Sequence, residues 1–540
     1  MTAGGGVSSR AVAGLALGAF LFYLIPFIAS TELVSPDDMI YDFYSTNLAE
    51  TGGFGYVPPG DAFFGRTGFT PRYFIYAGGG EKTFPRKFPG FILAWAGWKA
   101  LLPSFPGKLI NPAAAAAAVV LVYLIARRFH PRGPAAAGAA VLLAVNPILI
   151  HRAYMYNPTV FNLLFFLLSL WFLLEAVCRG GTVWFALLGL ASGCFLWIRP
   201  TNVVYLAGLA GLIFWERRRV RGPARFLLSL AVLAAGVGAL LWYNSRVFGS
   251  WLSLGYTAAT RVSGEVMGVK APLSVARILD YLNFHPSIWI NHVRMLPLTL
   301  TLAFPPLVLA LIGIFGGDDE PDRPRFRPFY LLLFALAVGF FSNFGTYGHE
   351  EGELTLHSSF LRYLLPALAL LCIPAAAAIG RFPRPRRALA AAVGLSLAVA
   401  VLAPGGVVET TLQSAYYGSV RVFIMNRVPA SGVLFSHYWD KTAFPERTVY
   451  THGTQLPEPG VGDAVADVLA RGREAWTTSH PCDALIREEA ARRGWPLEPH
   501  PGPEALSPVL RKASAFIPPS LYPLTLYRIR PGGAAGKTAP

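Results

Sequence analysis

Two adjacent carboxylates are the residues of this sequence whose position most readily suggests chemistry. Asp37 and Asp38 follow directly after an apolar run, in the segment Ser35-Pro36-Asp37-Asp38. At a membrane surface, low dielectric and mutual repulsion raise the pKa of one carboxyl of such a pair, which suits it to accept a proton from a reacting hydroxyl. The same segment is also a good helix start, because Ser35 can cap a helix and acidic residues are favourable in its first turn. The pattern alone leaves a general base and a helix cap as equal alternatives.

Basic residues that could hold an anion recur at the ends of the apolar runs. Arginine presents a planar fork to a phosphate and lysine a point charge. The candidates of this kind are Arg86, Lys87, Arg199, Arg246 and Arg362. For Arg246 the preceding segment Trp242-Tyr243-Asn244 leaves a plain aromatic belt as the alternative. His151 and Arg152 end another run, where an ionisable pair either serves function or extends its charges to the interface.

A loop at residues 345–359 contains the last candidates, His349, Glu350 and His357. Histidine and carboxylate are ligands for zinc or manganese. This loop has several glutamates within a few residues of each other, and such a group is also typical of a turn exposed to solvent. We expect this loop to contact an acceptor, and we expect the chemistry to need no metal or other cofactor.

The composition indicates which elements must position these groups. Of 540 residues, 54% are hydrophobic and 14% are charged, too few charges to cover soluble domains of this length. A bilayer crossing takes about 20 apolar residues. The sequence therefore predicts an α-helical polytopic membrane protein with about eleven spans. The apolar runs lie near residues 11–30, 109–126, 134–150, 158–176, 182–198, 200–215, 226–243, 296–315, 328–344, 360–380 and 387–403.

The basic clusters predict the orientation. A further apolar run at residues 88–102 is short and carries Lys99, which favours a helix lying at the interface over a crossing. If it does not cross, every later basic cluster falls on the cytoplasmic side, as the positive-inside bias requires. This predicts a multi-pass protein of the inner (plasma) membrane with a cytoplasmic N-terminus. The net charge of +16 is then a topology signal, and no nucleic-acid partner is expected.

The chain divides into two predicted domains. Residues 1–403 form the membrane domain, with a long external loop at 31–108, and residues 404–540 form a small extracytoplasmic α/β domain. In the second domain, residues 433–438 and 521–529 read as strands, and 462–476 and 482–495 as amphipathic helices. The candidate residues should gather on the external face.

The order of the motifs resembles the GT-C glycosyltransferases that use polyprenyl-phosphate sugars, including the protein O-mannosyltransferases and the aminoarabinose transferase of lipid A. The similar segments are Asp37-Asp38 before Tyr41 and Asn47-Leu48-Ala49-Glu50-Thr51-Gly52, then Lys87-Phe88-Pro89-Gly90-Phe91, Arg199 and Arg362-Tyr363-Leu364-Leu365-Pro366. The resemblance runs over roughly residues 10–400 and implies a GT-C fold. It also implies transfer of a sugar from a polyprenyl-phosphate donor to an acceptor hydroxyl of a glycan, lipid or protein. Asp37 would be the base and Asp38 its helper.

Asn157 is a departure from the family pattern. Several relatives present an aspartate in this turn, and asparagine cannot supply that charge. The main alternative function is a transporter or flippase of a lipid-linked sugar. Such a protein favours charges within spans and broken helices in matching halves, and the sequence shows neither pattern.

Overall fold

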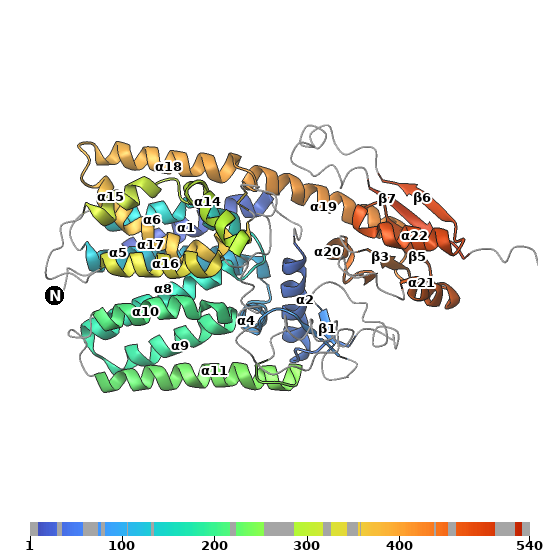
Figure 1. Ribbon diagram of the computed structural model, residues 1–540, viewed down its shortest axis with the longest axis horizontal. Helices are drawn as coiled ribbons and strands as arrows, with labels where there is room; N and C mark the ends of the chain where they lie inside the picture. Colours follow the sequence, from blue (N-terminus) through green and yellow to red (C-terminus); the bar gives the residue numbers. More distant parts are fainter. Residues whose placement is uncertain are drawn as a thin grey trace, which may run out of the picture.

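The protein consists of a helical bundle and an α/β unit joined by one long helix (Figure 1). The structure is a computed structural model. It describes residues 9–29, 35–57, 74–76, 82–104, 106–130, 134–215, 223–252, 286–316, 326–342, 355–356, 358–436, 439–451, 461–502 and 524–531.

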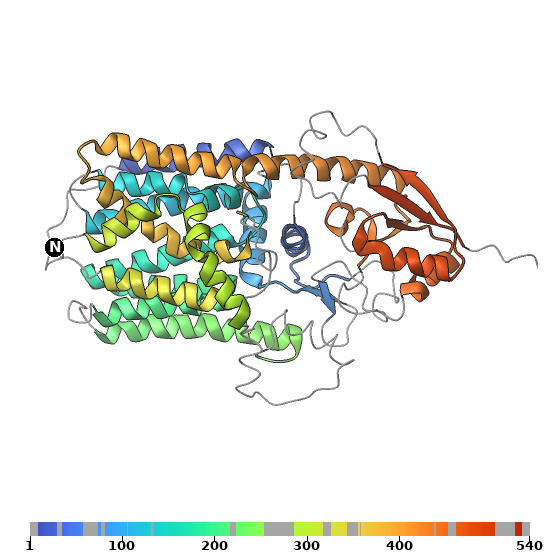
Figure 2. The same ribbon diagram turned by 45° about the horizontal axis from the view of Figure 1, so that its top comes forward.

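Most of the bundle helices run side by side along one axis (Figures 1 and 2). They are α1 (Ser9–Ala29), α5 (Ile110–Phe129), α6 (Ala135–Ala144), α7 (Pro147–Ala153), α8 (Thr159–Arg179), α9 (Thr182–Ile198), α10 (Val203–Trp215), α11 (Phe226–Phe248), α14 (Pro286–Ala303), α15 (Leu307–Phe315), α16 (Phe326–Phe341), α17 (Ser359–Ile379) and α18 (Pro385–Leu402). Short 3-10 turns are η1 (Gly107–Leu109), η2 (Pro200–Asn202) and η4 (Pro223–Arg225).

Each predicted apolar run falls on one of these helices or on a consecutive pair. Within the described residues, five helices are long and apolar enough to cross a membrane, and two bent pairs pass the same test together. Four shorter apolar helices accompany them: 10–26, 182–198, 200–215 and 327–341. The prediction of a multi-pass helical membrane protein is confirmed, whereas the number of eleven spans stays a prediction.

The bend between α6 and α7 places two candidate residues at the end of the bundle. Asn146 caps α7 by accepting a hydrogen bond from the Leu149 amide at 3.0 Å, and Pro147 occupies the first helical position, where it lacks no needed donor. The axis turns by 54° at this break. The Asn146 amide also donates to the Ala303 carbonyl at 2.9 Å, so the bend is fixed to α14.

Two helices outside the bundle lie at the same end. α2 (Pro36–Thr51) stops at Gly52, whose φ of 71° lies in the left-handed region that glycine adopts without strain. α4 (Pro89–Leu101) packs against α2, and the Lys99 ammonium lies 2.9 Å from Asp42. In Figure 2 the light-blue α4 crosses the end of the bundle instead of running along it, as expected of an interfacial helix. A small antiparallel pair, β1 (Phe74–Tyr76) with β2 (Thr83–Pro85), precedes α4.

The α/β unit follows α19 (Val407–Arg427), which continues from α18 and leads away from the bundle (Figure 1). Its five-stranded sheet has the order β4-β3-β5-β7-β6, in which β3 is parallel to β4 and β5 and β7 is antiparallel to β5 and β6. The elements are β3 (Val433–Phe435), α20 (Asp440–Ala443), β4 (Thr448–Tyr450), α21 (Val461–Ala470), β5 (Ala475–Thr478), η5 (Pro481–Asp483), α22 (Ala484–Arg492), β6 (Leu497–Pro501) and β7 (Thr525–Ile529).

The predicted elements of this unit need two corrections. The expected helix at 462–476 ends at Ala470, because Gly472 turns the chain with a φ of 70°, and Ala475 already begins β5. Strands β4 and β6 were not predicted: β4 has only three residues, and β6 contains two prolines, which are tolerated at the edge of a sheet. The division at residue 403, and the location of this unit outside the cytoplasm, remain predictions.

Candidate active site

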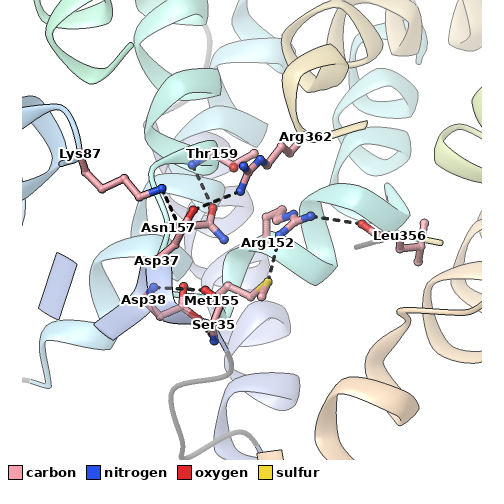
Figure 3. A network of polar contacts seen from close by, with 10 residues as sticks. All are labelled: Ser35, Asp37, Asp38, Lys87, Arg152, Met155, Asn157, Thr159, Leu356 and Arg362. Atoms are coloured by element: carbon pink, nitrogen blue, oxygen red, sulfur yellow. Dashed lines mark hydrogen bonds and ion pairs between the residues drawn. The ribbon is translucent and has the colours of Figure 1, made fainter. Parts of the chain in front are cut away.

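The start of α2 fixes the acidic pair. The Ser35 hydroxyl accepts a hydrogen bond from the Asp38 amide at 3.2 Å, and the Asp38 carboxylate accepts one from the Ser35 amide at 3.2 Å. This reciprocal capping box satisfies two backbone donors of the first turn. The helix-cap alternative is therefore confirmed for Asp38. Asp37 takes no part in the cap and is directed toward the bundle (Figure 3).

Asp37 is held between two cations from distant parts of the chain. Its Oδ1 lies 2.7 Å from Nζ of Lys87, just before α4, and its Oδ2 lies 3.5 Å from Nη1 of Arg362, in the first turn of α17 (Figure 3). The exposed fractions of these side chains are 16% for Asp37, 5% for Lys87 and 15% for Arg362. Burial alone would raise the pKa of Asp37, but the attraction of Lys87 and Arg362 outweighs it and lowers the pKa to about 2.

The pKa of Asp38 is shifted in the opposite direction. Burial, and then repulsion by Asp37, raise the pKa of Asp38 to about 7, although its hydrogen bonds with Ser35 and the charge of Arg152 partly oppose the rise. Its second oxygen, Oδ1, has no hydrogen-bond partner within the described residues. The two neighbouring carboxyls thus differ by several pKa units, the kind of separation that assigns different tasks to the two groups of a site.

Arg152 and His151 project from α7 at the bend. Arg152 is 3% exposed and donates to the Leu356 carbonyl and to the Met155 sulfur, both at 3.3 Å (Figure 3). His151 is fully buried, and its Nδ1 lies 3.1 Å from the Tyr154 hydroxyl. Both side chains lie inside the protein, so the alternative that they merely extend to the interface does not hold.

Arg199 ends α9 and is 7% exposed. Its guanidinium carbon lies 4.5 Å from the ring centroid of Tyr363, and its Nη1 has no hydrogen-bond partner within the described residues. Gly90 explains how the chain beside Lys87 comes close to the end of α9. A Cβ at Gly90 would lie 2.6 Å from the Trp197 carbonyl carbon, so any other residue would push α4 away.

Four of the predicted cations therefore form one group with the acidic pair. Lys87 and Arg362 contact Asp37, Arg152 acts on Asp38, and Arg199 also lowers the pKa of Asp37 through its charge. We call the six side chains of Asp37, Asp38, Lys87, Arg152, Arg199 and Arg362 the charged cluster. Four cations against two carboxylates, even with both ionised, leave a surplus of two positive charges (4 − 2) in a mostly buried site. Such a surplus is unfavourable without an anion, and arginine and lysine suit a phosphate.

The other predicted residues lie elsewhere or outside the described part. Arg246 lies over the ring of Trp242 on its own helix at 5.7 Å, as in the aromatic-belt alternative, so it is not part of the charged cluster. Arg86 is half-buried beside Lys87. His349, Glu350 and His357 lie outside the described residues. In the part of the chain that is described, no three His, Cys, Asp or Glu side chains are grouped as metal ligands.

Asn157 has a structural role that the sequence comparison did not suggest. Its side-chain oxygen accepts a hydrogen bond from the Thr159 amide at the start of α8 at 3.1 Å (Figure 3). Its backbone carbonyl accepts from the Asn111 amide at 3.1 Å. The turn between α7 and α8 is thus fixed by amides and supplies no carboxylate from this position.

Sequence reasoning also missed the part played by Tyr363. Its ring lies 4.5 Å from the guanidinium of Arg199 and 5.4 Å from that of Arg362. The only sequence signal was its place directly after Arg362 in a motif at the start of a span. The contact with Arg199 brings the end of α9 close to the first turn of α17, which no local pattern reveals.

Comparisons with known proteins agree with this architecture. The family model of the dolichyl-phosphate-mannose-protein mannosyltransferases matches residues 103–242. A search of curated proteins gives no match. The fold resembles the crystal structure of ArnT from Cupriavidus metallidurans bound to undecaprenyl phosphate, with a TM-score of 0.58 and 14% identity, over 97% of this chain and 98% of that chain.

A second solved relative is the oligosaccharyltransferase of Archaeoglobus fulgidus. Its apo structure matches with a TM-score of 0.52 and 14% identity, over 90% of this chain and 71% of that chain. The same enzyme tethered to an acceptor peptide that contains the NVT sequon gives a TM-score of 0.51 at 14% identity, with the same two coverages. The predicted GT-C fold is confirmed, and at these identities the likeness concerns the fold.

Proposed function

We propose that the protein is an integral membrane glycosyltransferase that moves a sugar from a polyprenyl-phosphate donor to an acceptor hydroxyl. The observation that carries this proposal is the surplus of buried positive charge around Asp37. A phosphate on a lipid brings negative charge to the membrane surface, and the charged cluster lies at one end of the bundle, where we expect that surface to be. ArnT, which has a similar fold, was solved with undecaprenyl phosphate, and this supports a polyprenyl phosphate as the donor's lipid part.

The reaction requires one proton acceptor and a set of cations. The acceptor oxygen forms a bond to the anomeric carbon, the bond from that carbon to the phosphate oxygen breaks, and its electron pair leaves with the phosphate. Lys87, Arg199 and Arg362 hold the departing phosphate, whose negative charge grows during the step. Asp37 takes the proton of the acceptor hydroxyl.

The low pKa of Asp37 fits this role once the donor is bound. Without a donor, Lys87 and Arg362 keep the carboxylate ionised with a pKa of about 2, which makes it a weak base. A bound phosphate competes for the same two cations and adds a negative charge nearby, and both effects raise the pKa of Asp37. Binding of the donor therefore prepares the base. Asp38, fixed by the capping box, assists by holding Asp37 in place.

The remaining candidate residues complete the proposed substrate site. We place Arg86, His151 and Arg246 among the substrate-binding residues, together with His349, Glu350 and His357 of the loop before α17. We also propose that transfer needs no metal. A chelator should leave turnover unchanged, and loss of turnover that returns when a divalent cation is added back would assign these histidines to a metal.

The proposal is tested by transfer of a labelled sugar in proteoliposomes that contain the purified protein. A panel of polyprenyl-phosphate sugars should include one donor that is consumed only when an acceptor is present, with release of polyprenyl phosphate. The bent pairs α6/α7 and α14/α15 are the observation that favours the alternative, a transporter or flippase, because broken helices are common in transporters. That alternative predicts movement of the intact lipid-linked sugar across the bilayer without release of the lipid phosphate.

A further inference from the structure

The ring of Tyr363 lies close to two of the three arginines of the charged cluster, Arg199 and Arg362. The guanidinium carbon of Arg199 lies 4.5 Å from its centroid and that of Arg362 lies 5.4 Å from it. Both distances are within the range of a cation–π contact, which is strongest where water is excluded. Arg199 comes from the end of α9 and Arg362 from α17, so the ring joins cations of two separate helices.

Besides its contacts with the cations, which include a hydrogen bond between its hydroxyl and Arg362, Tyr363 has contacts with two other helices. Tyr363 stacks on Phe341 of α16, with centroids 5.0 Å apart and planes only 5° from parallel. The Tyr205 hydroxyl of α10 donates a hydrogen bond to the Tyr363 backbone carbonyl. Residues of three helices, α10, α16 and α17, therefore help to determine where the ring lies.

Arg199 needs such support more than Lys87 or Arg362 does. Lys87 and Arg362 are paired with Asp37. Within the described residues, no carboxylate forms an ion pair with Arg199, and its Nη1 has no hydrogen-bond partner although the side chain is only 7% exposed. A buried guanidinium with an unused donor is ready for an anion. The electron-rich face of the Tyr363 ring lowers the cost of burying the Arg199 charge while no anion is bound.

We propose that Tyr363 is a positioning residue that uses its ring face to hold Arg199 in the orientation in which it receives the donor phosphate. This inference rests on the proposed function, because it assumes that Arg199 binds the lipid phosphate. Tyr363 itself touches no reacting atom. Its effect should therefore fall on donor affinity, and so on the KM for the donor, more than on kcat.

The test compares two substitutions in the full-length protein. Tyr363→Leu removes the ring, and Tyr363→Phe keeps it but removes the hydroxyl. Binding of polyprenyl monophosphate, with no sugar attached, is measured by calorimetry in detergent. We expect Tyr363→Leu to weaken binding about tenfold or more, and Tyr363→Phe to change it by about threefold at most. Equal losses in the two variants would show that the hydroxyl matters and would overturn the role of the ring.

A double-mutant cycle separates positioning from general packing. If Tyr363 acts through Arg199, the variant Arg199→Ala with Tyr363→Leu should bind little worse than Arg199→Ala alone, whereas independent effects would multiply. Tyr23→Leu is a matched control, since Tyr23 is a buried bundle tyrosine that donates to the Ala144 carbonyl, and its loss should leave binding unchanged. Fully multiplicative effects would overturn the inference.

Failure of this inference differs from failure of the proposed function. If wild-type protein binds polyprenyl phosphate and Arg199→Ala weakens that binding while Tyr363→Leu does not, only the role of Tyr363 is wrong. If wild-type protein fails to bind the lipid phosphate, the donor site and the positioning role fall together.

Discussion

The two ends of the helical bundle each bury a carboxylate between two cations, yet the cations at the two ends differ in how far their side chains are exposed. At the end away from α2, Glu175 of α8 is fully buried and forms ion pairs with Arg128 and Arg179, the latter at 2.5 Å. These arginines are 32% and 60% exposed. At the other end, Lys87 is 5% exposed and Arg362 is 15% exposed, and buried Arg152 and Arg199 add further charge.

On this difference we base the distinction between a structural ion pair and the proposed binding site. Arg128 and Arg179 are partly exposed, and each also lies over a tryptophan ring, Arg128 over Trp171 and Arg179 over Trp184. Their charges need no further partner. The charged cluster has little access to water and more cations than carboxylates, so an anion would stabilise it. A buried ion pair alone therefore says little about function, whereas a buried surplus of one sign does.

The largest effect that the comparison predicts is an all-or-none difference in topology. A reporter that works only outside the cytoplasm should be active when fused after Pro404, near the end that holds the charged cluster. It should be silent when fused at Arg219, within the basic segment between α10 and α11. The reverse pattern would place the charged cluster on the cytoplasmic side and would mean that the helix at residues 88–102 crosses the membrane.

The next largest effect concerns the two buried carboxylates. Asp37→Asn should lower turnover by roughly a hundredfold or more, because it removes a positioned base, while donor binding stays nearly intact. Glu175→Gln is the matched change at the other end. It should lower the thermal midpoint but leave turnover of the folded protein within about twofold of wild type. Turnover is measured with labelled donor, and near-normal turnover in Asp37→Asn would limit this carboxylate to anchoring Lys87 and Arg362.

The sequence predicted the cations of the site better than their arrangement. Runs of apolar residues indicated the helices, because about 20 such residues are needed for each crossing, and basic residues at their ends could be picked out directly. The pairing of Asp37 with Arg362 joins residues 325 positions apart (362 − 37). It depends on how α17 packs within the bundle, and no local pattern contains that information.

The acidic pair is a second case in which the sequence predicted the residues but not their contacts. The sequence offered a base and a helix cap as alternatives for the pair as a whole. In the structure the two residues have different contacts, since Asp38 completes the capping box and Asp37 contacts the cations. The division depends on side-chain direction at the first turn of α2.

The smallest effect is a change of stability with pH caused by Asp38. Its pKa is about 7 in the folded protein and near 3.8 when unfolded, so between these values the folded state binds more protons. The free energy of unfolding therefore decreases as the pH rises through this range. Asp37 acts in the opposite direction, but only at low pH: its stabilisation is complete above about 3.8 and is lost as the pH falls toward 2.

Thermal unfolding in detergent measures this effect. From about pH 5 to about pH 8 the midpoint of the wild-type protein should fall, and that of Asp38→Asn should fall less, because the substituted side chain does not titrate. Glu175→Gln should keep the wild-type slope, since Asp38 is still present. A slope that is the same in wild type and Asp38→Asn would show that Asp38 does not carry the raised pKa.

The central claim, that the buried surplus of positive charge holds a lipid phosphate, is tested most directly by binding of polyprenyl monophosphate without a sugar. The purified full-length protein is titrated with this lipid in wild-type form and as Lys87→Ala, Arg199→Ala and Arg179→Ala. We expect Lys87→Ala and Arg199→Ala each to weaken binding by about tenfold or more, and Arg179→Ala, at the solvated end, to leave it unchanged. Unchanged affinity in both Lys87→Ala and Arg199→Ala would contradict the claim.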